Sequence, residues 1–128
     1  MRIVADRPEY KPTWMYTEVL ERLWKSSGSP YVAAWDGLPV FPDWFHYEDG
    51  HLAAFKTGNL NLEVVTGAGR ISFLDGRHRT RWLMNRLAEV PVGLEEHHYQ
   101  QALMLGLASR HVAATDSFPM FDYRGRRP

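Results

Sequence analysis

The sequence predicts a single α+β domain in which a small mixed sheet is flanked by helices. Three observations predict this fold class. The chain has 128 residues, of which 45% are hydrophobic, and this is enough to supply the core of one domain. Short β-rich runs bounded by turn residues alternate with segments that have helical character. No internal repeat or low-complexity segment divides the chain.

The predicted helices have apolar residues at helical spacing or an acidic first turn: residues 13–25, 79–88 and 95–107. Thr13 is the expected cap of the first helix, and Gly28 lies just beyond its end. Glu95 and Glu96 suit the positive end of the dipole of the last helix.

The predicted strands are short runs bounded by turn residues: residues 31–35, 44–47, 52–55, 60–65, 70–74 and 90–94. Asp49-Gly50 is a strong hairpin signal between the second and third of these runs. Gly67-Ala-Gly69 is the expected turn between the next two. We therefore expect the core of the domain over about residues 30–107, followed by an irregular basic tail over residues 117–128.

Composition excludes several classes of protein. The chain has no cysteine, so it can form no disulfide, thiolate nucleophile or Cys-ligated zinc site. No run approaches the roughly 20 apolar residues of a membrane span, and the start of the chain lacks a secretory signal. We therefore expect a cytoplasmic protein without membrane insertion.

The net charge of zero conceals an asymmetry between the two halves of the chain. Residues 1–64 carry 6 Lys+Arg and 9 Asp+Glu, whereas residues 65–128 carry 9 and 6. Every Lys or Arg after Lys56 is an arginine, whose planar fork of donors matches phosphate and carboxylate groups. The pattern fits either an anionic ligand or an ordinary solvated surface.

The densest charge lies in DGRHRTR, residues 75–81, where a predicted strand turns into a predicted helix. The first amides of a helix have no partner inside it, and its dipole end is positive. Gly76 permits a positive φ and a close approach of a ligand to the backbone. The turn therefore predicts a phosphate site formed by Gly76, Arg77, Arg79, Thr80 and Arg81.

Two residues of this turn have several open roles. Asp75 is able to cap the helix, pair with an arginine, or help to hold a Mg²⁺ ion that bridges phosphates. His78 is either a proton-transfer group, since imidazole is the side chain suited to that role near neutral pH, or an ordinary surface residue. The alternative for the whole turn is a set of side chains that neutralise one another and point to water.

The run from Ile71 to Trp82, followed by a helix and Val90-Pro-Val-Gly-Leu94, resembles the core of the ParB/sulfiredoxin superfamily. The signature of that superfamily is a DGxHR- or GGxHR-type turn that opens a helix leading to a VPV-like strand. More specifically, the chain is similar to plasmid fertility-inhibition factors. The resemblance implies a ParB/sulfiredoxin-like fold and a turn that binds the phosphates of nucleotides or nucleic acid, with Asp75, Gly76, His78 and Arg79 at the matching positions.

The fertility-inhibition factors are associated with ATPase and DNase activity and with blocking DNA export. The resemblance therefore implies ATP or another nucleotide as ligand, Mg²⁺ as a cofactor, DNA as a further ligand, and a component of a conjugative or type IV secretion machinery as partner. Arg77 stands where sulfiredoxins have their reactive cysteine, which excludes sulfinic-acid reduction. The chain has no spare length for the helix-turn-helix and dimerisation segments of partition proteins.

These observations lead to one hypothesis and two alternatives. The hypothesis is a nucleotide- or DNA-phosphohydrolase that suppresses plasmid transfer, with Asp75, His78 and Arg79 as catalytic residues. This hypothesis predicts that Arg79→Ala abolishes nucleotide binding and leaves the thermal midpoint nearly unchanged. The alternatives are a non-enzymatic inhibitor of the transfer machinery and a sensor that binds CTP or ATP without turnover.

Three further groups are weaker candidates. The hairpin residues His46, Glu48, Asp49 and His51 carry metal-ligating groups, but strand alternation sends neighbours to opposite faces. His97 and His98 would lie roughly 100° apart on a helix, which argues against one shared ion. The tail is either a disordered solubilising segment or a contact for single-stranded nucleic acid through Arg124, Arg126 and Arg127.

Overall fold

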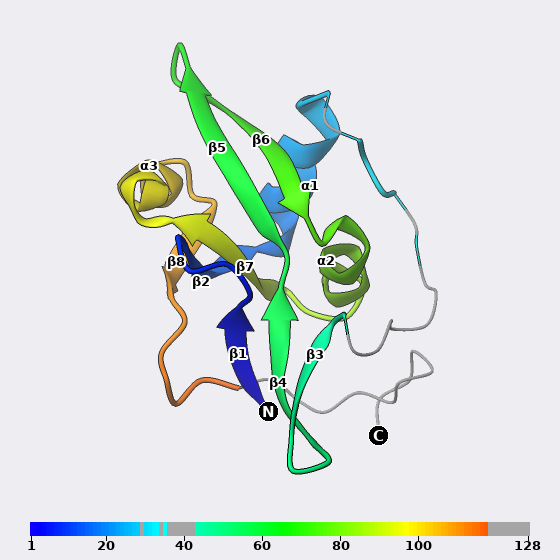
Figure 1. The fold of residues 1–128 in the computed structure, drawn as a ribbon. Helices are drawn as coiled ribbons and strands as arrows, with labels where there is room; N and C mark the ends of the chain where they lie inside the picture. The colour runs from blue at the N-terminus through cyan, green and yellow to red at the C-terminus, as the bar shows by residue number, and fades with distance from the viewer. Residues whose placement is uncertain (29, 34, 36–42, 118–128) are drawn as a thin grey trace.

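The computed structural model describes residues 1–28, 30–33, 35 and 43–117, which form a mixed α+β domain with two sheets (Figure 1). The expected α+β class is therefore confirmed. The strands are β1 (Arg2–Ala5), β2 (Tyr10–Tyr16), β3 (Phe45–Glu48), β4 (His51–Thr57), β5 (Asn59–Val65), β6 (Ala68–Asp75), β7 (Glu89–Glu95) and β8 (Ala108–His111). The helices are α1 (Thr17–Ser26), α2 (Arg77–Met84), the 3-10 turn η1 (Glu96–His98) and α3 (Tyr99–Met104).

The two sheets share one stretch of chain. The smaller sheet has the strand order β1-β4-β3, and the larger one has the order β6-β5-β7-β2-β8. Strand β4 pairs with β1 and β3, whereas β5 pairs with β6 and β7. Only Gly58 separates β4 from β5, so the two strands run on from one sheet into the other (Figure 1). This passage is buried over residues 57–59.

Helices cover the larger sheet, and the charged turn at the start of α2 lies against residues 57–59, where β4 continues into β5. Helix α1 packs against β6, and α2 packs against β7, with α2 and α3 on opposite sides of the view in Figure 1. A Cβ at Gly58 would lie 2.6 Å from Thr80 Oγ1 and 2.8 Å from the carbonyl oxygen of Gly76. The absence of a side chain at residue 58 therefore lets the first turn of α2 lie directly on the chain that joins the two sheets.

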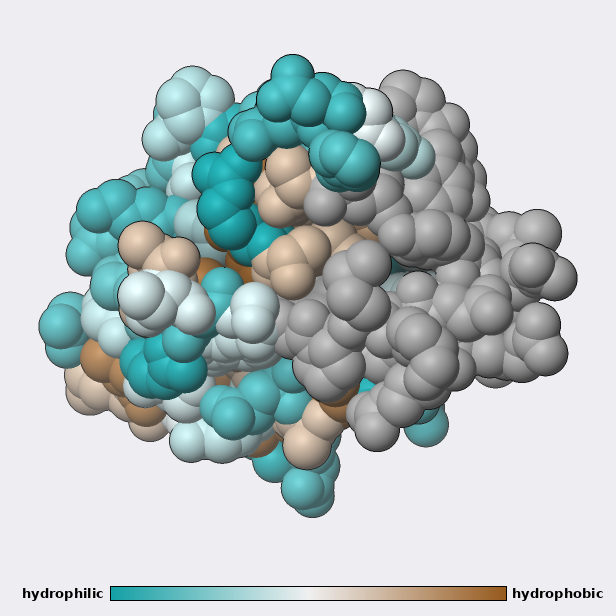
Figure 2. Space-filling model, turned by 90° about the horizontal axis from the view of Figure 1, so that it is seen from below, coloured by the Kyte–Doolittle hydropathy of each residue, from teal (hydrophilic) through white to brown (hydrophobic). Residues whose placement is uncertain are grey.

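One hydrophobic core serves both sheets. Its largest fully buried side chains come from the helices as well as the strands. Trp82 of α2 lies edge-on to Trp44 at 5.8 Å between ring centroids, and Phe55 of β4 packs against Phe45 of β3. The described part of the surface seen from below is mainly hydrophilic, with apolar residues in smaller groups between (Figure 2). No helix in the described ranges is long and apolar enough to cross a membrane.

The predicted helix over residues 13–25 is wrong in its first four residues. Residues Tyr10–Tyr16 form β2, which lies between β7 and β8, and α1 begins only at Thr17. Thr13, Trp14 and Met15 are all buried, because this strand is covered on both faces. A strand buried on both faces has a continuous apolar run, which periodicity alone cannot distinguish from a buried helical segment.

Most of the remaining predicted strands and turns are confirmed. The hairpin at Asp49-Gly50 is confirmed, with positive φ at both residues, as are the strands around residues 60–65, 70–74 and 90–94. The turn between β5 and β6 is at Thr66-Gly67, one residue before the expected position. Residues 30–33 and 35 form no strand, so that prediction is wrong over the described part of it.

The end of the chain also differs from the prediction. The single helix expected over residues 95–107 is shorter and is split into η1 and α3, and Gly106 then turns the chain into β8. Strands β1 and β8 lie outside the predicted set. Each has four residues and only one fully buried position, so neither has a clear alternation. The predicted tail lies outside the described residues from residue 118 onward.

Hydrogen bonds to Asp116 hold the segment that follows β8 against β2. Its carboxylate accepts hydrogen bonds from Arg110, from the Trp14 indole N–H at 2.9 Å and from the Ala113 amide at 2.8 Å. These three donors hold the pKa of Asp116 well below its ordinary value of 3.8. A carboxyl with a lowered folded-state pKa stabilises the fold fully above its unfolded-state pKa, and this contribution is lost progressively as the pH falls from that value toward the folded-state pKa.

Asp116→Asn is therefore expected to lower the thermal midpoint at pH 7, by an amount that stays nearly constant down to about pH 4 and shrinks steadily below it. Thermal unfolding followed by circular dichroism at several pH values measures the gap between wild type and variant. A gap of the same size at pH 7 and at about pH 2 would contradict the assigned role of the carboxylate.

Candidate functional site

The charged turn joins β6 to α2 through a left-handed residue. Gly76 has φ +76° and precedes the first residue of α2. No side chain of the described residues caps this helix, and the Thr80 amide makes the first α-helical bond to the Gly76 carbonyl at 3.0 Å. A cavity of about 350 Å³ opens at this end of the helix, lined by residues 75–79 together with Asp43, Trp44 and Leu74. The turn thus combines the start of a helix with a cavity.

Arg79 is a buried arginine in the wall of this cavity. Only 7% of its side chain is exposed. One terminal nitrogen donates to the Asp43 carbonyl at 3.0 Å, and the other lies 3.4 Å from Asp75 and 3.6 Å from Asp6. The Nε–H of Arg79 is buried and has no hydrogen-bond partner within the described part of the chain. Arg79 therefore ties the turn to the β1–β2 connection and to the chain before β3, and it retains one unused donor.

Asp75 belongs to a polar group, buried at Asn59 and Arg79 and open to solvent at Asp6 and Arg7, that we call the Asp75 cluster: Asp6, Arg7, Asn59, Asp75 and Arg79. Its Oδ2 accepts a hydrogen bond from Arg7 Nε at 2.8 Å, and its Oδ1 accepts one from Asn59 Nδ2 at 3.0 Å. Asn59 also donates to Asp6. The hydrogen bond to Asp75 raises the pKa of Arg7. Of the roles open to Asp75, the structure shows pairing with arginine, and no side-chain hydrogen bond caps α2.

Arg77 and His78 are the basic residues of the turn that face outward. Arg77 is half-buried and makes one long hydrogen bond of 3.5 Å to the Pro30 carbonyl. His78 is exposed, and its ring lies edge-on to Trp35 at 5.2 Å between centroids. Both residues line the cavity. They are therefore the side chains of the turn that are free to meet a ligand from solvent.

Thr80 and Arg81 do not line this cavity, contrary to the predicted grouping. The Thr80 hydroxyl is buried and donates to the Gly76 carbonyl at 2.8 Å. Arg81 is buried one turn further along α2, against α1, where it pairs with Glu21 and donates to the Val32 carbonyl. Burial raises the pKa of Glu21, but hydrogen bonds from Tyr31 and Arg81 outweigh it, so the pKa is lowered. Arg81 is neutralised within the fold.

The weaker candidates also have definite positions. His46 lies 3.6 Å from Glu48, which pairs with Arg2, and in the described residues the hairpin does not gather three metal-ligating groups. His97 and His98 lie in the 3-10 turn η1 instead of the predicted α-helix, with ring centroids 4.0 Å apart, so the α-helical spacing that argued against one shared ion does not apply to them. Arg124, Arg126 and Arg127 lie outside the described residues.

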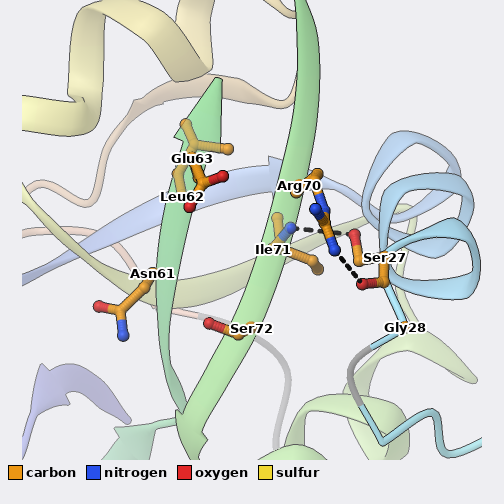
Figure 3. Close-up of a pocket in the computed structure, with 8 residues that line it drawn as sticks. All are labelled: Ser27, Gly28, Asn61, Leu62, Glu63, Arg70, Ile71 and Ser72. Carbon is orange, nitrogen blue, oxygen red and sulfur yellow. Dashed lines mark hydrogen bonds between the residues drawn. The ribbon is translucent and has the colours of Figure 1, made fainter. Parts of the chain in front are cut away.

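Sequence reasoning missed a second polar cavity, of about 340 Å³, between α1 and the β5–β6 hairpin (Figure 3). Its signal in the sequence is the alternation of polar residues on two paired strands, with Asn61 opposite Ser72 and Glu63 opposite Arg70. Figure 3 shows Arg70 directed at Ser27, whose carbonyl lies 3.4 Å from the guanidinium. Asn61 accepts a hydrogen bond from Tyr10. The polar groups of this cavity are thus largely engaged within the protein.

Comparison of the chain with protein-family models, with curated proteins and with solved structures gives no match. The resemblance to the ParB/sulfiredoxin superfamily therefore rests on residues 71–94 themselves. Any function assigned to the chain rests on the geometry of the turn.

Proposed function

We propose that the protein binds the phosphate groups of a nucleotide or a nucleic acid at the first turn of α2. One observation carries this proposal: the start of the helix, which no side chain of the described residues caps, and buried Arg79, whose Nε–H has no partner among those residues, line the same cavity. A buried donor without a partner costs free energy unless a ligand or water accepts its hydrogen bond. Backbone amides at a helix start favour the same kind of ligand, an anionic oxygen.

Charges around the cavity are arranged to tolerate such an anion. Asp6 and Asp75 are paired with Arg7 and Arg79, so their negative charge is largely neutralised. Arg77 and His78 stand at the outer rim. In this arrangement Arg77 pairs with a phosphate oxygen as a fixed cation, and His78 donates to another.

Binding without hydrolysis is the better supported form of the proposal. Both oxygens of Asp75 already accept hydrogen bonds, and both terminal nitrogens of Arg79 are engaged with the protein. Mg²⁺ bound at Asp75 would have to compete with Arg7. The engagement of Asp75 and Arg79 within the protein favours a nucleotide sensor or a non-enzymatic inhibitor over an ATPase or DNase. The biological role that we propose from the sequence resemblance is suppression of plasmid DNA transfer.

Arg77→Ala is expected to weaken nucleotide binding by about tenfold and to leave the thermal midpoint unchanged, because a charge-assisted hydrogen bond is worth about 1.5–3 kcal/mol. Calorimetric titration with ATP and CTP, with and without Mg²⁺, measures the affinity. Arg22→Ala removes the same charge from the exposed face of α1 and serves as the control. Equal binding by the two variants would place the ligand elsewhere.

A phosphate-release assay separates binding from hydrolysis. Purified protein incubated with ATP and Mg²⁺ is expected to release no phosphate above the background of an Asp75→Asn control. Release by the wild type that chelator and Asp75→Asn both abolish would instead establish the phosphohydrolase, with Asp75 exchanging Arg7 for the metal.

A further inference from the structure

Three metal-ligating side chains meet where β7 ends, away from the α2 turn. In the described part of the chain, Glu95, His97 and His98 form the one group of at least three such residues whose ligand atoms lie close together, all within 4.8 Å of one another. Glu95 is the last residue of β7, and the two histidines belong to η1. This corner leads into α3, on the opposite side of the molecule from α2 in the view of Figure 1.

The spacing of these atoms is close to that of a metal site. A tetrahedral zinc ion with bonds of about 2.0–2.2 Å holds its ligand atoms about 3.4 Å apart. Glu95 Oε2 already lies 3.8 Å from His97 Nδ1. The side chain of His97 is 67% exposed and that of Glu95 is 32% exposed, so both have room to rotate toward a common centre. Closing the group around an ion thus requires only side-chain movement.

His98 has an unused nitrogen in this corner. Its Nδ1 is buried and has no hydrogen-bond partner among the described residues. An imidazole nitrogen is a common ligand of divalent transition-metal ions. Within those residues, no other group uses this nitrogen of His98.

The surrounding charged groups do not compete for the same position. Glu96 is engaged with His111 at 3.1 Å and with Lys11 at 3.5 Å. His111 also stacks on Tyr99, with ring centroids 3.7 Å apart. Tyr10, which lies opposite Glu95 in the sheet, donates its hydroxyl to Asn61. Lys11, the one cation among these neighbours, is thus paired with Glu96 and leaves the three ligands free.

We propose that Glu95, His97 and His98 bind one divalent transition-metal ion, with Zn²⁺ as the reference ion. Two imidazoles and one carboxylate are a donor set that suits zinc, nickel and copper, and three protein ligands leave a coordination position for water or a further ligand. The metal site is independent of phosphate binding at α2, so a result that contradicts one proposal does not contradict the other.

Titration of the tag-free, chelator-treated full chain with Zn²⁺ in a calorimeter tests this site. We expect saturable binding of one ion per chain, and a loss of at least about tenfold in affinity for His97→Ala and for His98→Gln, since even a group that only supports a metal ligand is worth 10–100-fold. His46→Ala removes an exposed histidine of the β3–β4 hairpin and is expected to bind zinc like the wild type.

A second measurement distinguishes the loss of the metal site from misfolding of a variant. Co²⁺ in place of Zn²⁺ is expected to give intense visible absorption bands with the wild type and with His46→Ala, and weak ones with His97→Ala. Because His97 is largely exposed, its variant is expected to retain the circular dichroism spectrum of the wild type. Absence of saturable zinc binding, or zinc binding by His97→Ala as tight as by the wild type, would overturn the proposal.

Discussion

Replacing Arg79 with alanine is expected to lower the free energy of unfolding by about 3 kcal/mol, because it removes a buried guanidinium that pairs with Asp6 and Asp75 and donates to the Asp43 carbonyl. Arg79 is buried, and its loss would leave the Asp43 carbonyl without its donor and Asp6 and Asp75 facing each other across Asn59. In a domain of this size such a loss corresponds to a fall of about 10 °C in the thermal midpoint.

Denaturant unfolding of Arg79→Ala measures this change, and Arg77→Ala, two residues away and half-buried, is the matched control. The control is expected to unfold like the wild type. The sequence alone predicts that Arg79→Ala leaves the thermal midpoint nearly unchanged, and the burial of Arg79 is at odds with that expectation. A midpoint within a degree or two of the wild type would show that the Asp75 cluster contributes little to stability.

Gly76→Ala is expected to be destabilising by about 3 kcal/mol for two separate reasons. Residue 76 has φ +76°, a left-handed conformation that costs a residue with a Cβ about 1–2 kcal/mol. The added Cβ would also lie 2.4 Å from Gly58 Cα and 2.6 Å from Arg79 Nε, so the turn would have to move away from the junction between the sheets. Overpacking of this kind costs about 1–3 kcal/mol.

Gly67→Ala separates these two contributions. Gly67 has φ +80° in the β5–β6 turn, and a Cβ there would meet nothing within 4 Å. Its variant is therefore expected to lose only the conformational part, about 1 kcal/mol. Denaturant unfolding of both variants gives the difference, which measures the close approach of Gly76 to its neighbours. Equal losses would mean that the turn relaxes without cost.

Local signals in the sequence predicted the elements that are formed by neighbouring residues. The Asp49-Gly50 hairpin and the strand-turn-helix around Gly76 depend on backbone conformations that only a few residue types adopt. The boundary between β2 and α1 was missed, because Thr13–Met15 belong to a strand whose pairing partners, β7 and β8, come much later in the chain. Periodicity carries no information about such partners.

The same distinction applies to the candidate site. The cavity at the start of α2, which Gly76, Arg77 and His78 line, lies at the turn for which the sequence predicts a phosphate site. The burial of Arg79 was not predictable, because its partners Asp6 and Asp43 are far from it in the sequence. Arg81 and Glu21 are likewise separated by 60 residues. A pattern of charges shows which cations are present, whereas only the fold shows which of them are already neutralised.

The passage of β4 into β5 at Gly58 has a consequence for how the molecule unfolds. Because the strands of both sheets belong to one continuous backbone, neither sheet can lose its pairing at this point without pulling on the other. The shared tryptophan-rich interior reinforces this link. The two sheets are therefore one cooperative unit, and partial opening of the molecule is confined to its outer edges, far from residues 57–59.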